Sequence, residues 1–262
     1  MCPRGGRLLG GAGSPLAEVR LVCHCLLIEA GGSLVLVDTG LGTGDAEDPK
    51  RLGRPFRALV RPRCELGETA VRQIERLGLD SGDVRQIVAT HLDLDHAGGL
   101  ADFPAAEVHV FAPELAAAKA PPLRERNRYV AAQWAHGPNW VEHELAGDTW
   151  FGFDSVRLLP GLDEEIALVP LLGHSTGHAG VAIREDGRWL LHCGDAYFHT
   201  DEVATPHSCP PGLRLFQNLV GHDAKVRRHN QERLRELARE HRHEVRLICS
   251  HDSTELEREQ GA

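Results

Sequence analysis

Short runs of β-branched and apolar residues recur along the chain, and they predict mostly strands. Val19 to Glu29 (VRLVCHCLLIE) and Ser33 to Asp38 (SLVLVD) flank a Gly-Gly pair, which predicts a buried β-hairpin. Further runs of this kind, each bounded by turn residues, predict strands at 84–89, 107–111, 155–159, 166–172, 180–184, 188–192 and 244–249.

Helical spacing of apolar residues occurs between some of these strands. Glu68 to Leu77 has apolar residues on one helical face and stops at Gly78, Pro113 suits the first turn of a helix, and Asp223 to His241 predicts a long helix. Strand-to-helix alternation therefore appears in both halves of the chain. This pattern favours an α/β protein of two βα halves packed sheet to sheet, with helices outside, over a doubly wound parallel sheet.

One segment has a different texture from the rest. Residues 121–153 hold six of the 13 Phe, Trp and Tyr side chains of the chain and are interrupted by proline and glycine. We expect one domain spanning residues 1–262, in which 121–153 is an insert. The insert either covers a site, as loops on a rigid scaffold commonly do, or is a surface excursion with a small core of its own.

The densest chemistry in the sequence lies at Thr90 to Gly99. His91, Asp93, Asp95 and His96 fall within six positions directly after a predicted strand. Without a cation, the two carboxylates would repel each other and would lose hydration on burial. A bound divalent metal offsets this free-energy cost. Three later predicted strands also end in a metal-capable residue beside Gly or Ser, at His174, Asp195 and His251.

Composition excludes several classes of protein. The net charge of -9, without a basic stripe, argues against a nucleic-acid partner. The seven cysteines are scattered without a CxxC pair, which fits a reducing compartment. No secretory leader is visible, and no apolar run approaches the ~20 residues of a membrane span. We therefore expect a cytoplasmic protein with no membrane association.

Five motifs in order resemble the metallo-β-lactamase superfamily. They are Asp38-Thr39-Gly40, His91-x-Asp93-x-Asp95-His96, Gly173-His174-Ser175-Thr176-Gly177-His178, Gly194-Asp195 and Ser250-His251-Asp252. The resemblance implies a four-layered αβ/βα sandwich with two divalent metal ions at its edge. By the same resemblance the first metal is bound by His91, Asp93 and His174, and the second by Asp95, His96 and His251. Asp195 bridges the two.

The donor types suit zinc, and iron or manganese as alternatives. Two adjacent cations would generate a bridging hydroxide near neutral pH, and the hydroxide would attack a carbonyl or phosphoryl centre. Asp93 departs from the pattern, because most hydrolytic members carry histidine there, whereas the flavodiiron proteins carry Glu and bind iron. The identity of the metal and the occupancy of the first position are therefore open. In a zinc hydrolase, Asp93→His should preserve or raise zinc binding.

Tyr197 is the one candidate catalytic residue that is not a metal ligand. In the N-acyl homoserine lactonases, which the chain resembles around Asp195 and His251, a tyrosine three positions after the aspartate polarises the substrate carbonyl. Here the third position is Phe198, so Tyr197 either takes that role from a displaced position or is an ordinary strand-end aromatic. We expect His178 to be a buried hydrogen-bonding residue, Asp252 to orient His251 or cap local backbone, and Cys23 and Cys25 to pack in the core.

The resemblance favours a metal-dependent hydrolase of an ester-type carbonyl in a small-molecule substrate, with a lactone as the expected substrate and with Asp95 and Asp195 in the catalytic centre. A thioesterase of the glyoxalase II type is an alternative, although we expect no glutathione-binding module after His251. An iron-dependent oxidoreductase on the same fold, or a non-enzymatic metal-binding or sensing protein, also stays open. Exposed aromatic residues in 121–153 leave a homodimer open.

Overall fold

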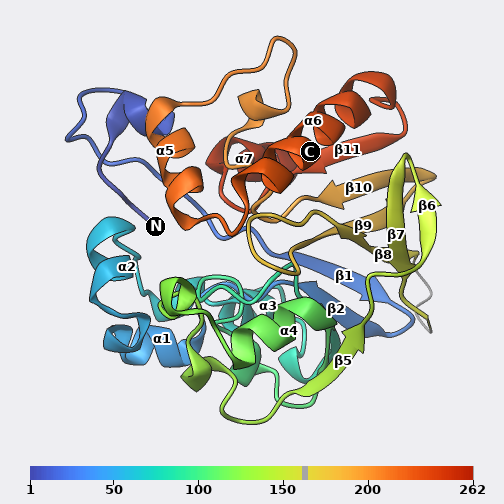
Figure 1. The fold of residues 1–262 in the computed structure, drawn as a ribbon. Helices are drawn as coiled ribbons and strands as arrows, with labels where there is room; N and C mark the ends of the chain where they lie inside the picture. Colours follow the sequence, from blue (N-terminus) through green and yellow to red (C-terminus); the bar gives the residue numbers. More distant parts are fainter. Residues whose placement is uncertain (161–164, 262) are drawn as a thin grey trace. The chain divides into compact units, whose positions relative to one another are not determined.

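The computed structural model describes residues 1–160 and 165–261, and its backbone contacts divide the chain into two compact units (Figure 1). The β1–β5 unit comprises Cys25–Glu144. The β6–β11 unit comprises Met1–His24 together with Leu145–Ala262. Each unit contains one sheet and its own helices.

The β1–β5 unit is built on a five-stranded mixed sheet in the order β1-β2-β3-β4-β5. β1 and β2 are antiparallel, whereas β2, β3, β4 and β5 run parallel to one another. This confirms the predicted hairpin and the predicted strands at 84–89 and 107–111. The strands are Leu26–Ala30 (β1), Ser33–Val37 (β2), Val84–Val88 (β3), Glu107–Phe111 (β4) and Asn139–His143 (β5).

The predicted first strand is wrong at its start, because β1 begins at Leu26 rather than Val19. The backbone N–H groups of Val22 and His24 donate instead to the carbonyls of His251 and Ser250. These four residues all belong to the β6–β11 unit. Apolar composition alone does not reveal that this stretch bonds to a loop rather than to β2.

Helices of the β1–β5 unit bury their apolar faces in one core with the sheet. Val71, Ile74 and Leu115 join sheet residues such as Ile87 and Val108, all nearly inaccessible to water. The prediction of a helix ending before Gly78 is confirmed. The helices are Thr43–Glu47 (α1), Arg54–Leu59 (α2), Ala70–Arg76 (α3) and Ala112–Lys119 (α4), with 3₁₀ turns at Pro49–Leu52, Leu66–Glu68, Ser81–Asp83, Leu100–Asp102, Leu123–Glu125 and Ala131–Gln133.

The β6–β11 unit is built on a six-stranded mixed sheet in the order β11-β10-β9-β8-β7-β6. Only β10 and β11 are parallel, and every other neighbouring pair is antiparallel. The predicted strands after residue 154 are all present. The strands are Asp148–Trp150 (β6), Phe153–Leu158 (β7), Ile166–Pro170 (β8), Ala179–Glu185 (β9), Arg188–His192 (β10) and Val245–Ile248 (β11).

The predicted long helix of this unit is confirmed as α6, Ala224–Glu240, with Asp223 as its N-cap. Leu234 and Leu237 of α6 pack in a core with Val169, Leu191 and other sheet residues. Two more helices, Pro211–Val220 (α5) and Ser253–Gln260 (α7), and 3₁₀ turns at Gly6–Leu9 and Thr200–Glu202 complete the unit. The α/β class is thus confirmed, with two mixed sheets.

The aromatic-rich segment 121–153 contributes to both units. It contains β5 and β6, each of which is an edge strand of its sheet. Trp134 and Trp140 pack against the core of the β1–β5 unit, and Trp150 and Phe151 against the core of the β6–β11 unit. Its description as an insert in a single domain stays a prediction.

None of the helices within residues 1–160 and 165–261 has the length and apolarity needed to cross a membrane. The longest among them, α6, has 17 residues and carries many charged side chains.

Candidate metal centre

In the β1–β5 unit, the loop that carries His91, Asp93, Asp95 and His96 follows β3. It is hydrogen-bonded to Asp38, the residue after β2. Val37 and Val88 are partners in the parallel β2–β3 pair, so Asp38 and Thr90 lie at the same edge of the sheet. Asp38 adopts a left-handed backbone conformation with φ of 54°. Its Oδ1 accepts from the Thr90 N–H at 2.7 Å, and its Oδ2 accepts from the Thr90 hydroxyl at 2.7 Å.

These contacts fix which ring nitrogen of each histidine carries a lone pair. His96 Nδ1 lies 2.9 Å from Asp38 Oδ2, and because a carboxylate only accepts, Nδ1 donates. The Thr90 hydroxyl gives its one proton to Asp38, so at 2.9 Å from His91 Nδ1 it accepts from that nitrogen. The Nε2 atoms of His91 and His96 therefore carry the lone pairs, as metal ligands require.

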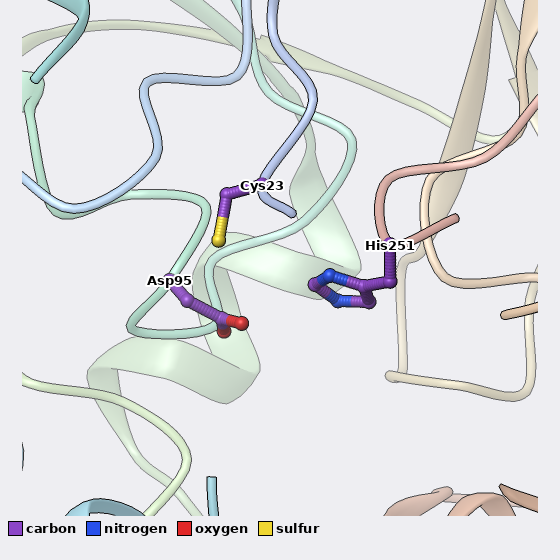
Figure 2. A group of neighbouring side chains, drawn as sticks. All are labelled: Cys23, Asp95 and His251. Atoms are coloured by element: carbon purple, nitrogen blue, oxygen red, sulfur yellow. The ribbon is translucent and has the colours of Figure 1, made fainter. Parts of the chain in front are cut away.

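The two imidazoles lie close together and out of the solvent. Their ring centroids are 4.0 Å apart, and both side chains are almost fully buried. Asp38, His91 and His96 each offer a ligand atom within a group spanning no more than 4.8 Å. Asp95 is also buried and projects from the same loop (Figure 2).

Side chains from two neighbouring segments hold this loop in place. Glu114 of α4 accepts from the Leu92 N–H at 3.1 Å, and Gln133 donates to the Leu94 carbonyl at 2.8 Å. The backbone also approaches too closely for a side chain at Gly98, where a Cβ would lie 2.6 Å from the Gly40 carbonyl oxygen. Substitution at Gly98 would therefore displace the loop.

In the β6–β11 unit, three metal-capable residues follow strands that run in the same direction. β8 and β10 are both antiparallel to β9, and β11 is parallel to β10. The carboxyl ends of these three strands therefore lie at one edge of the sheet. His174, Asp195 and His251 come shortly after β8, β10 and β11, as the sequence predicted.

The structure brings these three side chains together around Asp195. His174 Nε2 lies 3.4 Å from Asp195 Oδ2, and His251 Nε2 lies 3.0 Å from Asp195 Oδ1. His251 Nδ1 lies 2.7 Å from the Val22 carbonyl, so it donates there and leaves the lone pair on Nε2. In the neutral imidazole this lone pair faces a carboxylate oxygen at 3.0 Å, which favours either a proton or a metal ion between the two atoms, so the arrangement can hold a shared metal ion.

Two of the supporting predictions are confirmed. His178 is fully buried, accepts from the Asp195 N–H through Nε2 at 2.9 Å, and donates from Nδ1 to the Leu171 carbonyl at 2.9 Å. Asp252 caps α7 by accepting from the Thr254 N–H at 2.8 Å. Both residues therefore fix backbone next to a predicted ligand.

Tyr197 and Phe198 lie in different surroundings. The Tyr197 hydroxyl donates to Glu255 at 3.1 Å inside the core of the unit, where burial raises the pKa of the phenol well above its usual value. Phe198, at the position of the lactonase tyrosine, stacks on the His251 ring with centroids 4.9 Å apart. A catalytic role for Tyr197 stays a prediction, and its hydroxyl is engaged by Glu255.

Cys23 lies closer to a predicted ligand than the sequence indicated. Its segment is not a strand, so the alternation that would place both cysteines in a core does not apply. Cys25 packs against the core of the β1–β5 unit, whereas the Cys23 sulfur lies within 4.8 Å of a His251 ring nitrogen (Figure 2). Both thiols are half-buried.

Sequence reasoning missed the partner of Asp93. Arg128 Nη1 donates to both carboxylate oxygens of Asp93 at 2.8 Å, and Asp93 Oδ2 lies 3.6 Å from His91 Nε2. Arg128 is 35 residues from Asp93 and lies in the aromatic-rich segment. No local pattern marks it, since arginines are common along the chain.

Glu255, the acceptor of the Tyr197 hydroxyl, is buried, and the pH dependence of the protein's stability tests the effect of this burial on its pKa. Burial raises its pKa to about 7 from the usual 4.5, so the folded protein binds this proton more tightly than the unfolded chain does. The stability contributed by the protonated form is lost as pH rises from about 4.5 to 7, by about 3 kcal/mol. We expect Glu255→Gln to match the wild type near pH 4.5 and to be more stable at about pH 8.

Urea unfolding in the presence of a chelator, at both pH values, measures this effect. The control is Glu257→Gln, since Glu257 is an exposed residue of the same helix. Equal stabilities of Glu255→Gln and wild type at the higher pH would contradict the assignment.

Comparison with known proteins identifies the family. The family model described as the metallo-beta-lactamase superfamily matches residues 19–242. The chain belongs to the metallo-β-lactamase superfamily. It is 47% identical over 235 residues to a protein of Mycobacterium tuberculosis described as a probable metallo-hydrolase, a match that covers 89% of this chain and 76% of that one. It is 28% identical over 192 residues to the N-acyl homoserine lactonase AttM of Azorhizobium caulinodans, with 65% of this chain and 64% of that one covered.

Solved structures confirm the metallo-β-lactamase fold. A mutant form of AiiA from B. thuringiensis, with N-decanoyl-L-homoserine bound at its active site, has a TM-score of 0.71 and 22% identity. That similarity covers 100% of this chain and 92% of the other. The dizinc quorum-quenching lactonase AidC has a TM-score of 0.56 at 17% identity, covering 90% of this chain and 74% of that one.

The donor set of this superfamily member fits divalent cations. Imidazole nitrogens with correctly placed lone pairs, together with carboxylates, are ligands for zinc, iron and manganese. The β1–β5 unit supplies His91, Asp93, Asp95 and His96, and the β6–β11 unit supplies His174, Asp195 and His251. Their division into two metal positions stays a prediction from the family pattern.

Proposed function

We propose that the protein is a metal-dependent hydrolase that opens an ester-type carbonyl, with a lactone as the substrate class. The observation that carries this proposal is the placement of His174 and His251 on either oxygen of Asp195. The 47% identical relative described as a probable metallo-hydrolase supports hydrolysis, and the more distant lactonases support a lactone.

In this proposal the ligands of both units together hold two metal ions, with zinc as the favoured metal. Bound divalent cations lower the pKa of a coordinated water and polarise a carbonyl. Asp195 would be shared between the two positions, while His178 holds its backbone and Asp38 holds the His96 ring. Phe198, stacked on His251, would offer an apolar surface beside the metals rather than a hydroxyl.

A metal and substrate panel tests the proposal. We expect purified protein to contain about two zinc ions and to hydrolyse lactones faster than thioesters and phosphodiesters. Removal of the metal with a chelator should lower turnover by roughly 100-fold or more, because the activated water is lost, and added zinc should restore it. Metal content by mass spectrometry and turnover by pH-stat titration are the measurements.

Three outcomes would contradict the proposal. Faster thioester cleavage would indicate a thioesterase. Iron with oxygen consumption would indicate an oxidoreductase. Bound metal without turnover of any ester, thioester or phosphodiester would indicate a binding or sensing protein.

A further inference from the structure

Arg128 forms an ion pair with Asp93, one of the residues predicted to bind the first metal ion. One guanidinium nitrogen lies 2.8 Å from each oxygen of Asp93. The two side chains are largely buried, with 6% of Arg128 and 15% of Asp93 exposed. A charge-assisted pair of this kind, shielded from water, is stronger and better fixed than a surface ion pair.

Arg128 is itself held against the loop it contacts. Its carbonyl accepts from the Leu94 N–H at 3.2 Å. Arg128 therefore bonds to two successive residues of the loop, Asp93 through its side chain and Leu94 through its backbone. The next residue, Tyr129, donates to Glu114 at 3.3 Å, and Glu114 accepts from the Leu92 N–H. The guanidinium therefore has little freedom to leave Asp93.

The pair leaves Asp93 in a position from which it can still act as a ligand. Its Oδ2 lies 3.6 Å from His91 Nε2, the atom that carries the His91 lone pair. Two ligands of one tetrahedral cation, each about 2.0–2.2 Å from it, are roughly 3.3–3.6 Å apart. A carboxylate oxygen has two lone-pair directions, so Oδ2 can accept from Arg128 and face a cation as well.

We propose that Arg128 is a positioning residue of the metal centre, which aims Asp93 Oδ2 beside His91 Nε2 and cancels the charge of Asp93. The pair then adds no net charge to the first metal position. This inference rests on the proposed metal-dependent function. It explains how a carboxylate can stand at position 93 without changing the charge of the centre.

With Arg128 in place, the expectation for Asp93→His is the reverse of the one that the sequence alone supports. A neutral histidine would remove the Asp93 carboxylate, so the positive charge of Arg128 would act more strongly against the cation. We expect Asp93→His to weaken zinc binding at the first position by roughly 10-fold or more. In the double variant Asp93→His/Arg128→Gln the repulsion is removed, and zinc binding should return to within about 3-fold of the wild type.

The experiment is a double-mutant cycle on zinc affinity, measured by competition with a chromophoric chelator. The variants are Asp93→His, Arg128→Gln and the double variant, with Arg124→Gln as the control because Arg124 is an exposed arginine of the same segment. Near-UV circular dichroism checks that each protein is folded. Arg128→Lys combined with Asp93→His retains the positive charge, so it should bind zinc as weakly as Asp93→His alone.

Two outcomes would overturn the inference. One is zinc binding by Asp93→His that equals or exceeds the wild type, a result that does not depend on Arg128→Gln folding. The other is an effect of Asp93→His that is the same with and without Arg128, which would make Arg128 only a structural brace. Lactone turnover is measured separately on the wild type. Coupling without turnover defeats the proposed function alone, and turnover without coupling defeats this inference alone.

Discussion

Replacing Asp195 with alanine is expected to lower kcat/KM on the best substrate by about 10³-fold, the upper range for loss of a major electrostatic stabiliser. The Asp195 carboxylate contacts both His174 and His251 of its unit. Alanine would remove the proposed shared ligand and the Asp195 carboxylate that both buried imidazoles contact. Steady-state turnover and metal content of the variant measure the two consequences.

The control for this variant is Glu236→Ala, because Glu236 is an exposed carboxylate on α6 of the same unit. Asp195→Ala must also retain its near-UV spectrum, since His178 accepts from the Asp195 backbone, which alanine preserves. Turnover close to that of the wild type would exclude a bridging role for Asp195.

Replacing Asp38 with alanine is expected to lower metal affinity about 10- to 100-fold, as for other residues that orient a metal-ligating histidine. Asp38 accepts from His96 Nδ1 and twice from Thr90, and Thr90 in turn orients His91. Loss of the Asp38 carboxylate would release both rings and remove the acceptor of three buried donor contacts, so stability should fall by roughly 2–4 kcal/mol as well. Chelator competition and urea unfolding measure these effects.

Asparagine is the matched replacement at this position. It tolerates the positive φ of 54° at residue 38 and keeps one acceptor oxygen, so Asp38→Asn should lose less than alanine does. Asp83→Ala, at an exposed position of the same unit, is the control. Unchanged metal affinity in both Asp38 variants would show that the His96 ring is oriented by other contacts.

Most strands were predictable because each is a short apolar run that ends at turn residues. The errors have physical causes. Residues 19–24 have strand-like composition, but the N–H groups of Val22 and His24 bond to the loop after β11 rather than to a neighbouring strand. β5 and β6 are short edge strands with exposed polar positions, so their sequences lack the buried pattern of the central strands.

The sequence by itself determined the donor types and their placement after strands, because that information is local. His91, Asp95, His96, His174, Asp195 and His251 follow predicted strands, and five motifs in order indicated the superfamily that the comparisons then showed.

Only the tertiary structure decided which partners control those donors, because each partner is distant in the chain. Asp38 reaches His96 across 58 residues, and Arg128 reaches Asp93 across 35. Such pairings depend on strand order and on loops packed against them, which periodicity does not encode. Asp93 shows the difference most clearly. In the sequence this residue is only a departure from the family pattern. In the structure the Arg128 guanidinium pairs with its carboxylate, which gives a reason why a carboxylate can be accommodated there.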